Sequence, residues 1–357
     1  MTLWETVRKI EGADETAVRE CRRRWDAVAK PLRSLGLLET LTAQMAGVQR
    51  TAAPHLDRPR VLVFCADNGI LAEGVSQSGS EVTLAVAEAL AAGHSNVNIM
   101  ARCAGADVET YDVGMAQESE DPAVVRAKLR RGTANFACGA AMTEEEAIFA
   151  LEAGIHAVEK AHADGCDILV AGEMGIGNTT SSAAVLSVLL GLDPAAVTGR
   201  GSGLDDAGLR RKREAIARGI AVNKPDPTDP LDVLRKVGGF DIAAICGAYL
   251  AGAALGIPVV LDGLISGAAA VLAARFCPKA ADALLPSHQS REPGGSPALT
   301  ALGLRAPIVA DLALGEGTGG VLLLPMLRMA LAVLNGEHSF ASIGVEAYTP
   351  QSGGEGA

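Results

Sequence analysis

Two glycine-rich segments contain the residues best suited to chemistry. The first, GEMGIGNTTSS at 172–182, follows one apolar run and opens another. Its glycines let the backbone approach a ligand closely, and free N–H groups at a helix N-terminus bind phosphate. The segment has neither the GK[ST] of a Walker loop nor GxGxxG spacing. It predicts a mononucleotide-phosphate site, with a plain strand–helix turn as the alternative.

The second segment, LGEGTGG at 314–320, places Glu316 just before the apolar run 321–334. A carboxylate in that position either caps the helix or, if it faces a substrate, acts as a general base. Glu173 is a second carboxylate at the end of an apolar run. No Ser–His or Cys–His arrangement accompanies them, so we expect chemistry without a covalent enzyme intermediate.

A third glycine-rich turn, TGRGSGLDD at 198–206, precedes the basic cluster 210–213. From this cluster we select Lys212 as the cation that neutralises a phosphate; a solvated helix face is the alternative. His288 lies in a polar loop, and the sequence leaves its role open between structure and substrate contact. Three more carboxylates follow apolar runs at spacings that fit no metal motif, and we expect them to cap turns: Asp67, Asp262 and Asp311.

Short apolar runs that alternate with helical stretches predict the scaffold for these loops. Such alternation is typical of an α/β protein with a mostly parallel sheet, whose ligands bind at the carboxyl ends of the strands. We expect a helical N-terminal lobe over 1–55, joined by C-terminal helices at about 336–350. An α/β core over 56–335 and a flexible tail over 351–357 complete the prediction. The predicted strands are 60–67, 106–114, 167–172, 258–263 and 307–312.

Composition narrows the classes of function. The chain has 357 residues, of which 49% are hydrophobic and only 3% aromatic, so an aliphatic core is expected. A net charge of −11 argues against a nucleic-acid partner. No secretion signal opens the chain, no apolar run reaches membrane-spanning length, and the scattered cysteines form no CxxC pair. We therefore expect a cytoplasmic protein without membrane attachment or bound zinc.

The sequence resembles the nicotinate-nucleotide–dimethylbenzimidazole phosphoribosyltransferase family. Matching stretches follow the family's order over almost the whole chain: KPLRSLGLLETL, VFCADNGILAEGVS, GEMGIGNTT, GRGSGLDD, VGGFDIAAICGAYLAGA, VVLDGLIS, SHQSREPG and LGEGTGG. The resemblance implies a Rossmann-like three-layer core with a small helical lobe, in a homodimer whose sites lie near the interface. It also implies transfer of phosphoribose from nicotinate mononucleotide to 5,6-dimethylbenzimidazole, which releases nicotinate and gives α-ribazole 5′-phosphate. Neither a metal nor an organic cofactor is expected.

The resemblance also implies roles for individual residues. Glu316 aligns with the family's catalytic base, and Glu173 aligns with a second active-site acid that acts on the ribose or the acceptor. The expected phosphate and ribose site comprises Gly175, Ile176, Gly177, Asn178, Thr179, Thr180, Gly201, Ser202, Gly203 and Lys212. The expected acceptor site comprises Ser78, Val86, Met174 and Leu314.

Three positions depart from the family's pattern. Asn68 replaces a histidine in CADHG, Gly79 replaces a proline, and Val86 replaces an acceptor-contacting glutamine. We expect these changes to leave the donor site intact and to make the acceptor wall more apolar. Because apolar contacts discriminate less than hydrogen bonds do, other benzimidazoles, adenine or phenols become candidate acceptors.

Three other functions stay open. The chain could be one subunit of a heteromeric phosphoribosyltransferase, a heterodimer with a homologue, that acts on phenolic or other non-benzimidazole acceptors. It could also bind a small aromatic molecule or a nucleotide without catalysis. A nucleotide-dependent oxidoreductase is less well supported, because no GxGxxG follows the first predicted strand.

Overall fold

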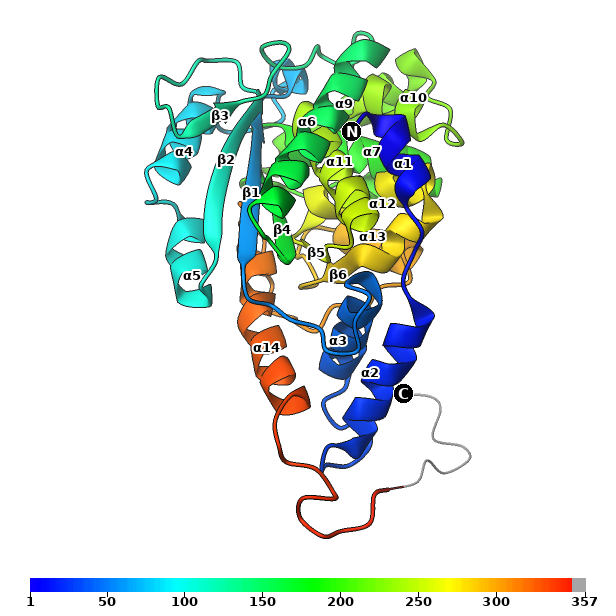
Figure 1. The fold of residues 1–357 in the computed structure, drawn as a ribbon. Helices are drawn as coiled ribbons and strands as arrows, with labels where there is room; N and C mark the ends of the chain where they lie inside the picture. Colours follow the sequence, from blue (N-terminus) through cyan, green and yellow to red (C-terminus); the bar gives the residue numbers. More distant parts are fainter. Residues whose placement is uncertain (349–357) are drawn as a thin grey trace.

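The centre of the molecule is a six-stranded sheet. A computed structural model describes residues 1–348, and all its strand pairs are parallel, in the order β3-β2-β1-β4-β5-β6 (Figure 1). This is the predicted α/β class. The strands are β1 (Pro59–Ala66), β2 (Asp107–Gly114), β3 (Val124–Arg126), β4 (Ile168–Met174), β5 (Val259–Leu261) and β6 (Leu284–Pro286).

Helices cover both faces of the sheet, which makes three layers. In β1, Leu62, Phe64 and Ala66 pack on one face, and Val61, Val63 and Cys65 on the other. The first face is covered by α1 (Leu3–Lys9), α6 (Glu144–Ala163), α7 (Asn178–Leu190), α11 (Phe240–Leu255) and α12 (Leu264–Phe276). The second face is covered by α4 (Glu81–Ala91), α5 (Asn96–Ala104) and α14 (Thr318–Leu334). Strands buried on both faces explain why they appear in the sequence as continuous apolar runs.

The remaining helices are short or lie outside these layers. They are α2 (Glu15–Ala27), α3 (Leu37–Val48), η1 (Gly69–Glu73), α8 (Pro194–Val197), α9 (Asp206–Asn223), α10 (Pro230–Val237), η2 (Pro278–Ala283) and α13 (Gly295–Ala301). None of the helices within 1–348 is long and apolar enough to cross a membrane.

The small helical bundle at one end of the molecule differs from the expected lobe. Figure 1 shows α2 and α3 beside α14, and their buried side chains share one apolar cluster. Helix α1, by contrast, packs on α6 and α11 of the core. The helices predicted at 336–350 are absent from the described part, 336–348, which forms turns; residues 349–350 and the predicted tail lie outside the described residues. The domain boundary at 55/56 stays a prediction.

One predicted strand is wrong. Residues 307–312 form only an isolated bridge, between Ile308 and His288, and the sixth strand is instead β6. The segment is apolar in composition, but Val309 at its centre is 75% exposed, so it lacks the buried surface that would hold a strand in the sheet. β3 and β6, with three residues each, were not predicted, whereas the equally short β5 lies within the predicted apolar run 258–263.

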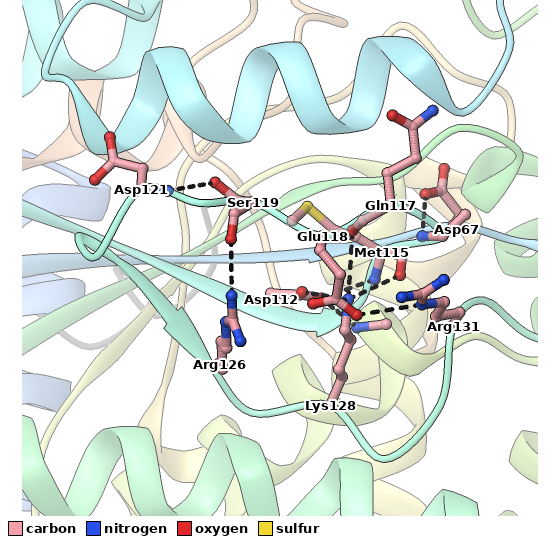
Figure 2. Close-up of polar contacts among 12 residues, drawn as sticks. Asp67, Asp112, Met115, Gln117, Glu118, Ser119, Asp121, Arg126, Lys128 and Arg131 are labelled. Carbon is pink, nitrogen blue, oxygen red and sulfur yellow. Dashed lines mark hydrogen bonds and ion pairs between the residues drawn. The ribbon is translucent and has the colours of Figure 1, made fainter.

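A largely buried lysine holds the loops beyond β2 and β3. Lys128 pairs with Asp112 at 2.7 Å and with Glu118 at 3.3 Å, and it donates to the carbonyls of Met115 and Gln117 (Figure 2). Asp67, at the end of β1, accepts the Ala116 N–H of the same loop at 2.8 Å. These bonds give the carboxyl edge of the sheet a rigid flank.

Candidate active site

One cavity of about 350 Å³ lies at the carboxyl ends of β4 and β5, and it brings most of the predicted site residues together. It is large enough for a small ligand, since such pockets typically measure roughly 300–1,000 Å³. The predicted residues that line it are Ser78, Val86, Glu173, Met174, Gly175, Ile176, Gly177, Asn178, Thr179, Gly201, Ser202, Leu314 and Glu316. Thr180, Gly203 and Lys212 do not line it.

The GEMGIGNTT segment forms the turn from β4 into α7. Gly177 is the N-cap of α7 and has φ +96°, a conformation that side chains disfavour. A Cβ at Gly175 would lie 2.5 Å from the Ala66 carbonyl oxygen, so this turn needs glycine for close packing. The N-terminus of α7 therefore lies at the cavity, which Gly177, Asn178 and Thr179 line, and helix N-termini of this kind bind anions.

Lys212 lies directly behind this turn. It is completely buried, and its Nζ donates to Thr179 Oγ1 at 2.7 Å. A Cβ on Gly201 would lie 3.3 Å from the same Nζ. Within 1–348 no carboxylate forms an ion pair with Lys212, and burial lowers its pKa to about 8, partly opposed by Glu292. A buried ammonium without a counter-ion is poised to bind an anion.

The LGEGTGG segment is held by Asp262, which follows β5. The Asp262 carboxylate accepts the N–H groups of Gly317, Gly319 and Gly320 at 2.8–3.2 Å, and so caps α14 from a distant part of the chain. Burial raises the pKa of Asp262 to about 6, although these three bonds oppose the shift. The prediction that Asp262 acts as a cap is confirmed, since its carboxylate caps the N-terminus of α14.

Glu316 has an unusual backbone conformation within that segment. Its φ is +61°, between Gly315 at +92° and Gly317 at +90°. A left-handed conformation costs a non-glycine residue roughly 1–2 kcal/mol, so the bonds to Asp262 must hold it. The Glu316 Oε2 accepts the Val97 N–H, in the first turn of α5, at 3.1 Å. Oε1 has no hydrogen-bond partner among the described residues, and the side chain lines the cavity.

Glu173 is part of a buried acidic group. Asn178 Nδ2 donates to Glu173 Oε2 and, at 2.8 Å, to Asp241 Oδ2. Burial raises the pKa of Glu173 to about 8, and the charges of Asp241, Asp262 and Glu316 add to the shift. Burial also raises the pKa of Asp241 to about 6. At neutral pH Glu173 is therefore mostly a neutral carboxylic acid that can donate a hydrogen bond.

We expect the free energy of unfolding to fall as pH rises from 5 to 8. Glu173 stays protonated in the folded chain up to about pH 8, whereas the unfolded chain releases this proton above its ordinary pKa of 4.5. The folded state then binds more protons, so stability declines by up to about 1.4 kcal/mol per pH unit. Urea unfolding across this range should show a smaller slope for Glu173→Gln. The exposed Glu214→Gln is the matched control, and an equal slope in wild type and Glu173→Gln would contradict the assignment.

One part of the cavity lining is apolar. Val75, Val82 and the predicted residues Val86, Met174 and Leu314 line it. Asn68, by contrast, does not line the cavity. It packs against the turn from β4 into α7, where its Oδ1 accepts a hydrogen bond from Ser181 Oγ at 2.9 Å and its N–H donates to the Ile176 carbonyl. Asn68 is therefore outside the lining of the cavity, and the expected effect of the three departures on an acceptor stays a prediction.

Sequence reasoning missed several residues that line the cavity. Ser290 and Glu292 come from the loop after β6, in the stretch SHQSREPG, and Asn96 comes from the first turn of α5. Asp241 was also missed; it does not line the cavity, but Asn178 connects it to Glu173. Polar residues directly after a short apolar run are the available signal for Ser290 and Glu292, but that signal depends on recognising β6 itself.

Comparison with known proteins agrees with this geometry. A family model described as phosphoribosyltransferase matches residues 10–345. The nicotinate-nucleotide–dimethylbenzimidazole phosphoribosyltransferase of Ruminiclostridium cellulolyticum is 41% identical over 98% of this chain and 99% of its own length. The enzyme of the same name from Thermus thermophilus is 46% identical over 90% of this chain and 96% of its own.

Solved structures agree in fold. A crystal structure of CobT from Thermus thermophilus superposes with a TM-score of 0.89 at 45% identity, over 93% of this chain and all of that one. Identity above 40% across nearly the full length of both chains leaves no large part of the fold unmatched. The chain is an enzyme that belongs to the nicotinate-nucleotide–dimethylbenzimidazole phosphoribosyltransferase family.

Proposed function

We propose that the enzyme transfers phosphoribose from nicotinate mononucleotide to 5,6-dimethylbenzimidazole or a related aromatic acceptor, with Glu316 as general base. One observation carries the proposal: Glu316 and the phosphate turn line a single cavity, behind which Lys212 is buried without a counter-ion. Substrates held in one cavity react without the entropic cost of meeting in solution, an advantage of several kcal/mol.

The proposed reaction needs little acid catalysis. A ring nitrogen of the acceptor attacks C1′ of the donor, and the bond from C1′ to the pyridinium nitrogen breaks. The electron pair of that bond returns to the ring, so nicotinate leaves without being protonated. The acceptor's N–H proton passes to Glu316, which restores a neutral aromatic ring in the product.

The buried acidic groups suit the charges of this reaction. The donor's pyridinium is cationic, and positive charge develops on the ribose as the C1′–N bond breaks. Carboxylates that face the reacting carbon stabilise such charge. Glu173, neutral at pH 7, acts as a hydrogen-bond donor to the ribose or to the acceptor, while the phosphate binds at the first turn of α7 and Lys212.

The acceptor range follows from the apolar wall. Val86, Met174 and Leu314 offer no hydrogen bond by which to reject a wrong ring. Benzimidazoles and phenols should therefore compete for the same surface. The proposal includes a dimer, formed by two copies of this chain or by this chain and a homologue.

The purified chain alone should release nicotinate from nicotinate mononucleotide when dimethylbenzimidazole is added, and chromatography should detect the phosphoribosylated product. Competition between dimethylbenzimidazole and p-cresol measures the acceptor range. No release by the chain alone, with activity restored by a homologous chain, would support the heteromeric phosphoribosyltransferase instead. Substrate binding without any nicotinate release would leave only a binding protein.

A further inference from the structure

Two polar side chains at one corner of the cavity have no part in the mechanism above. His288 and Ser290 both line it, and their exposed fractions are only 4% and 8%. They come from the loop after β6, which contributes to the cavity lining. Polar groups so deeply buried are expected to have hydrogen-bond partners.

The bonds around His288 define which ring nitrogen carries the proton. Ser287 Oγ donates its one proton to the Leu261 carbonyl at 2.5 Å. At 3.0 Å from His288 Nδ1, the same oxygen can only accept, so Nδ1 carries a proton. Burial lowers the pKa of His288, which keeps the ring neutral. Nε2 therefore presents a lone pair, and no partner for it exists within residues 1–348.

Ser290 supplies the complementary group. Its Oγ accepts the Glu292 N–H at 3.3 Å, and its hydroxyl proton has no acceptor in the described part of the chain. A Cβ built on Gly263 would lie 3.7 Å from Ser290 Oγ and 3.8 Å from His288 Nε2. One acceptor and one donor thus border the same small space beside Gly263, which also lines the cavity.

We propose that His288 Nε2 and Ser290 Oγ together recognise one ribose hydroxyl of the donor. This inference rests on the proposed function and extends it to donor specificity. A hydroxyl both donates and accepts, as this pair requires. A phosphate dianion or the nicotinate carboxylate has no proton to give to Nε2, and the acceptor's N–H is directed to Glu316. Only the ribose hydroxyls of nicotinate mononucleotide can satisfy both side chains.

The test compares nicotinate mononucleotide with its 2′-deoxy and 3′-deoxy analogues. In wild type, kcat/KM should favour the ribonucleotide over one of the two analogues by about 100-fold or more, because an unpaired buried group rejects a substrate that lacks the hydroxyl. His288→Ala and Ser290→Ala should each reduce that preference at least about tenfold. His288→Gln, whose amide oxygen can accept, should restore part of it. The exposed His156→Ala is the control and should leave it unchanged.

The comparison between wild type and variant cancels the different intrinsic reactivity of the analogues. Equal loss of kcat/KM for all three donors in His288→Ala would overturn the inference and leave His288 a structural residue. A preference among the three donors that neither His288→Ala nor Ser290→Ala changes would overturn it as well. If His288→Ala does not fold, Ser290→Ala decides alone.

The two proposals fail in distinguishable ways. Turnover without any hydroxyl preference contradicts only the specificity inference. Absence of nicotinate release contradicts the proposed function, and calorimetric titration of the same three donors then still measures whether the hydroxyl is recognised.

Discussion

Glu316→Gln should lower kcat by about 10²–10⁴-fold while the affinity for nicotinate mononucleotide stays within about threefold of wild type. A positioned general base contributes an acceleration of that size. Glutamine removes the proton-accepting carboxylate but keeps an oxygen that can accept the Val97 N–H, so the first turn of α5 stays in place. Steady-state kinetics together with calorimetric titration of the donor separate the two effects.

The same contact creates a rival explanation, in which Glu316 matters only because it holds α5. Comparison with Glu316→Ala separates the two roles. A residue that only caps α5 would leave Glu316→Gln nearly as active as wild type and make Glu316→Ala inactive. A general base makes both variants slow, with the larger loss of stability in the alanine variant, since that one also leaves the Val97 N–H unpaired. Turnover of Glu316→Gln within twofold of wild type would remove Glu316 as the base.

The strained backbone of Glu316 indicates that its side chain does more than cap α5. Helix N-termini are capped well by Ser95 and similar residues with ordinary extended backbone, as α5 itself shows. Glu316 instead has a left-handed conformation that Asp262 must maintain through Gly317, Gly319 and Gly320. Local strain kept by bonds from a distant strand is common where a side chain must point at a substrate.

The parallel sheet was predictable because its central strands are buried on both faces. β1 and β4 consist almost entirely of apolar residues, and the polar loops follow directly at their ends. The segment 307–312 has a similar apolar composition but is largely exposed, and composition alone cannot separate an exposed segment from a buried strand. The short β6 is held in the sheet by its parallel pairing with β5, which its own sequence does not reveal.

The site residues also differ in how well the sequence predicts them. Lys212 is selected from the basic cluster with the support of the family resemblance, and the structure places it on the buried face of α9 with Gly208, Ala215, Ile216 and Gly219. The acidic group of Glu173, Asp241 and Asp262 could not be assembled from the sequence, since its members lie in β4, in the first turn of α11 and directly after β5. Their raised pKa values arise from three-dimensional proximity, for which one sequence carries no signal.

Lys212→Met should reduce kcat/KM for nicotinate mononucleotide by about 30-fold to several thousand-fold, since loss of one partner from a buried charge pair costs roughly 2–5 kcal/mol. Methionine fills a similar volume and removes a desolvated ammonium, so the variant should fold at least as stably as wild type. Nicotinate riboside, which lacks the phosphate, is the discriminating substrate. Wild type and Lys212→Met should use it within about threefold of each other.

The exposed Arg210→Met is the matched control, because it removes one positive charge from the same helix. A general electrostatic effect would lower the activity of both variants with nicotinate mononucleotide. A phosphate contact lowers that of Lys212→Met alone. If Lys212→Met loses activity equally with the riboside and the nucleotide, the lysine supports the fold of the site and does not bind the phosphate.

The pH dependence of donor binding gives an independent measurement. In the free enzyme the pKa of Lys212 is lowered to about 8 by burial, and a bound phosphate raises it again because it stabilises the ammonium. Binding therefore takes up a proton above pH 8, and the dissociation constant of the nucleotide should rise by up to about tenfold per pH unit there. Lys212→Met has no such proton, so between pH 8 and 9 its dissociation constant should rise less steeply than that of wild type, and the double variant Lys212→Met/Glu173→Gln removes both groups that titrate near pH 8. A slope as steep in Lys212→Met as in wild type would mean that the buried ammonium is not the phosphate's partner.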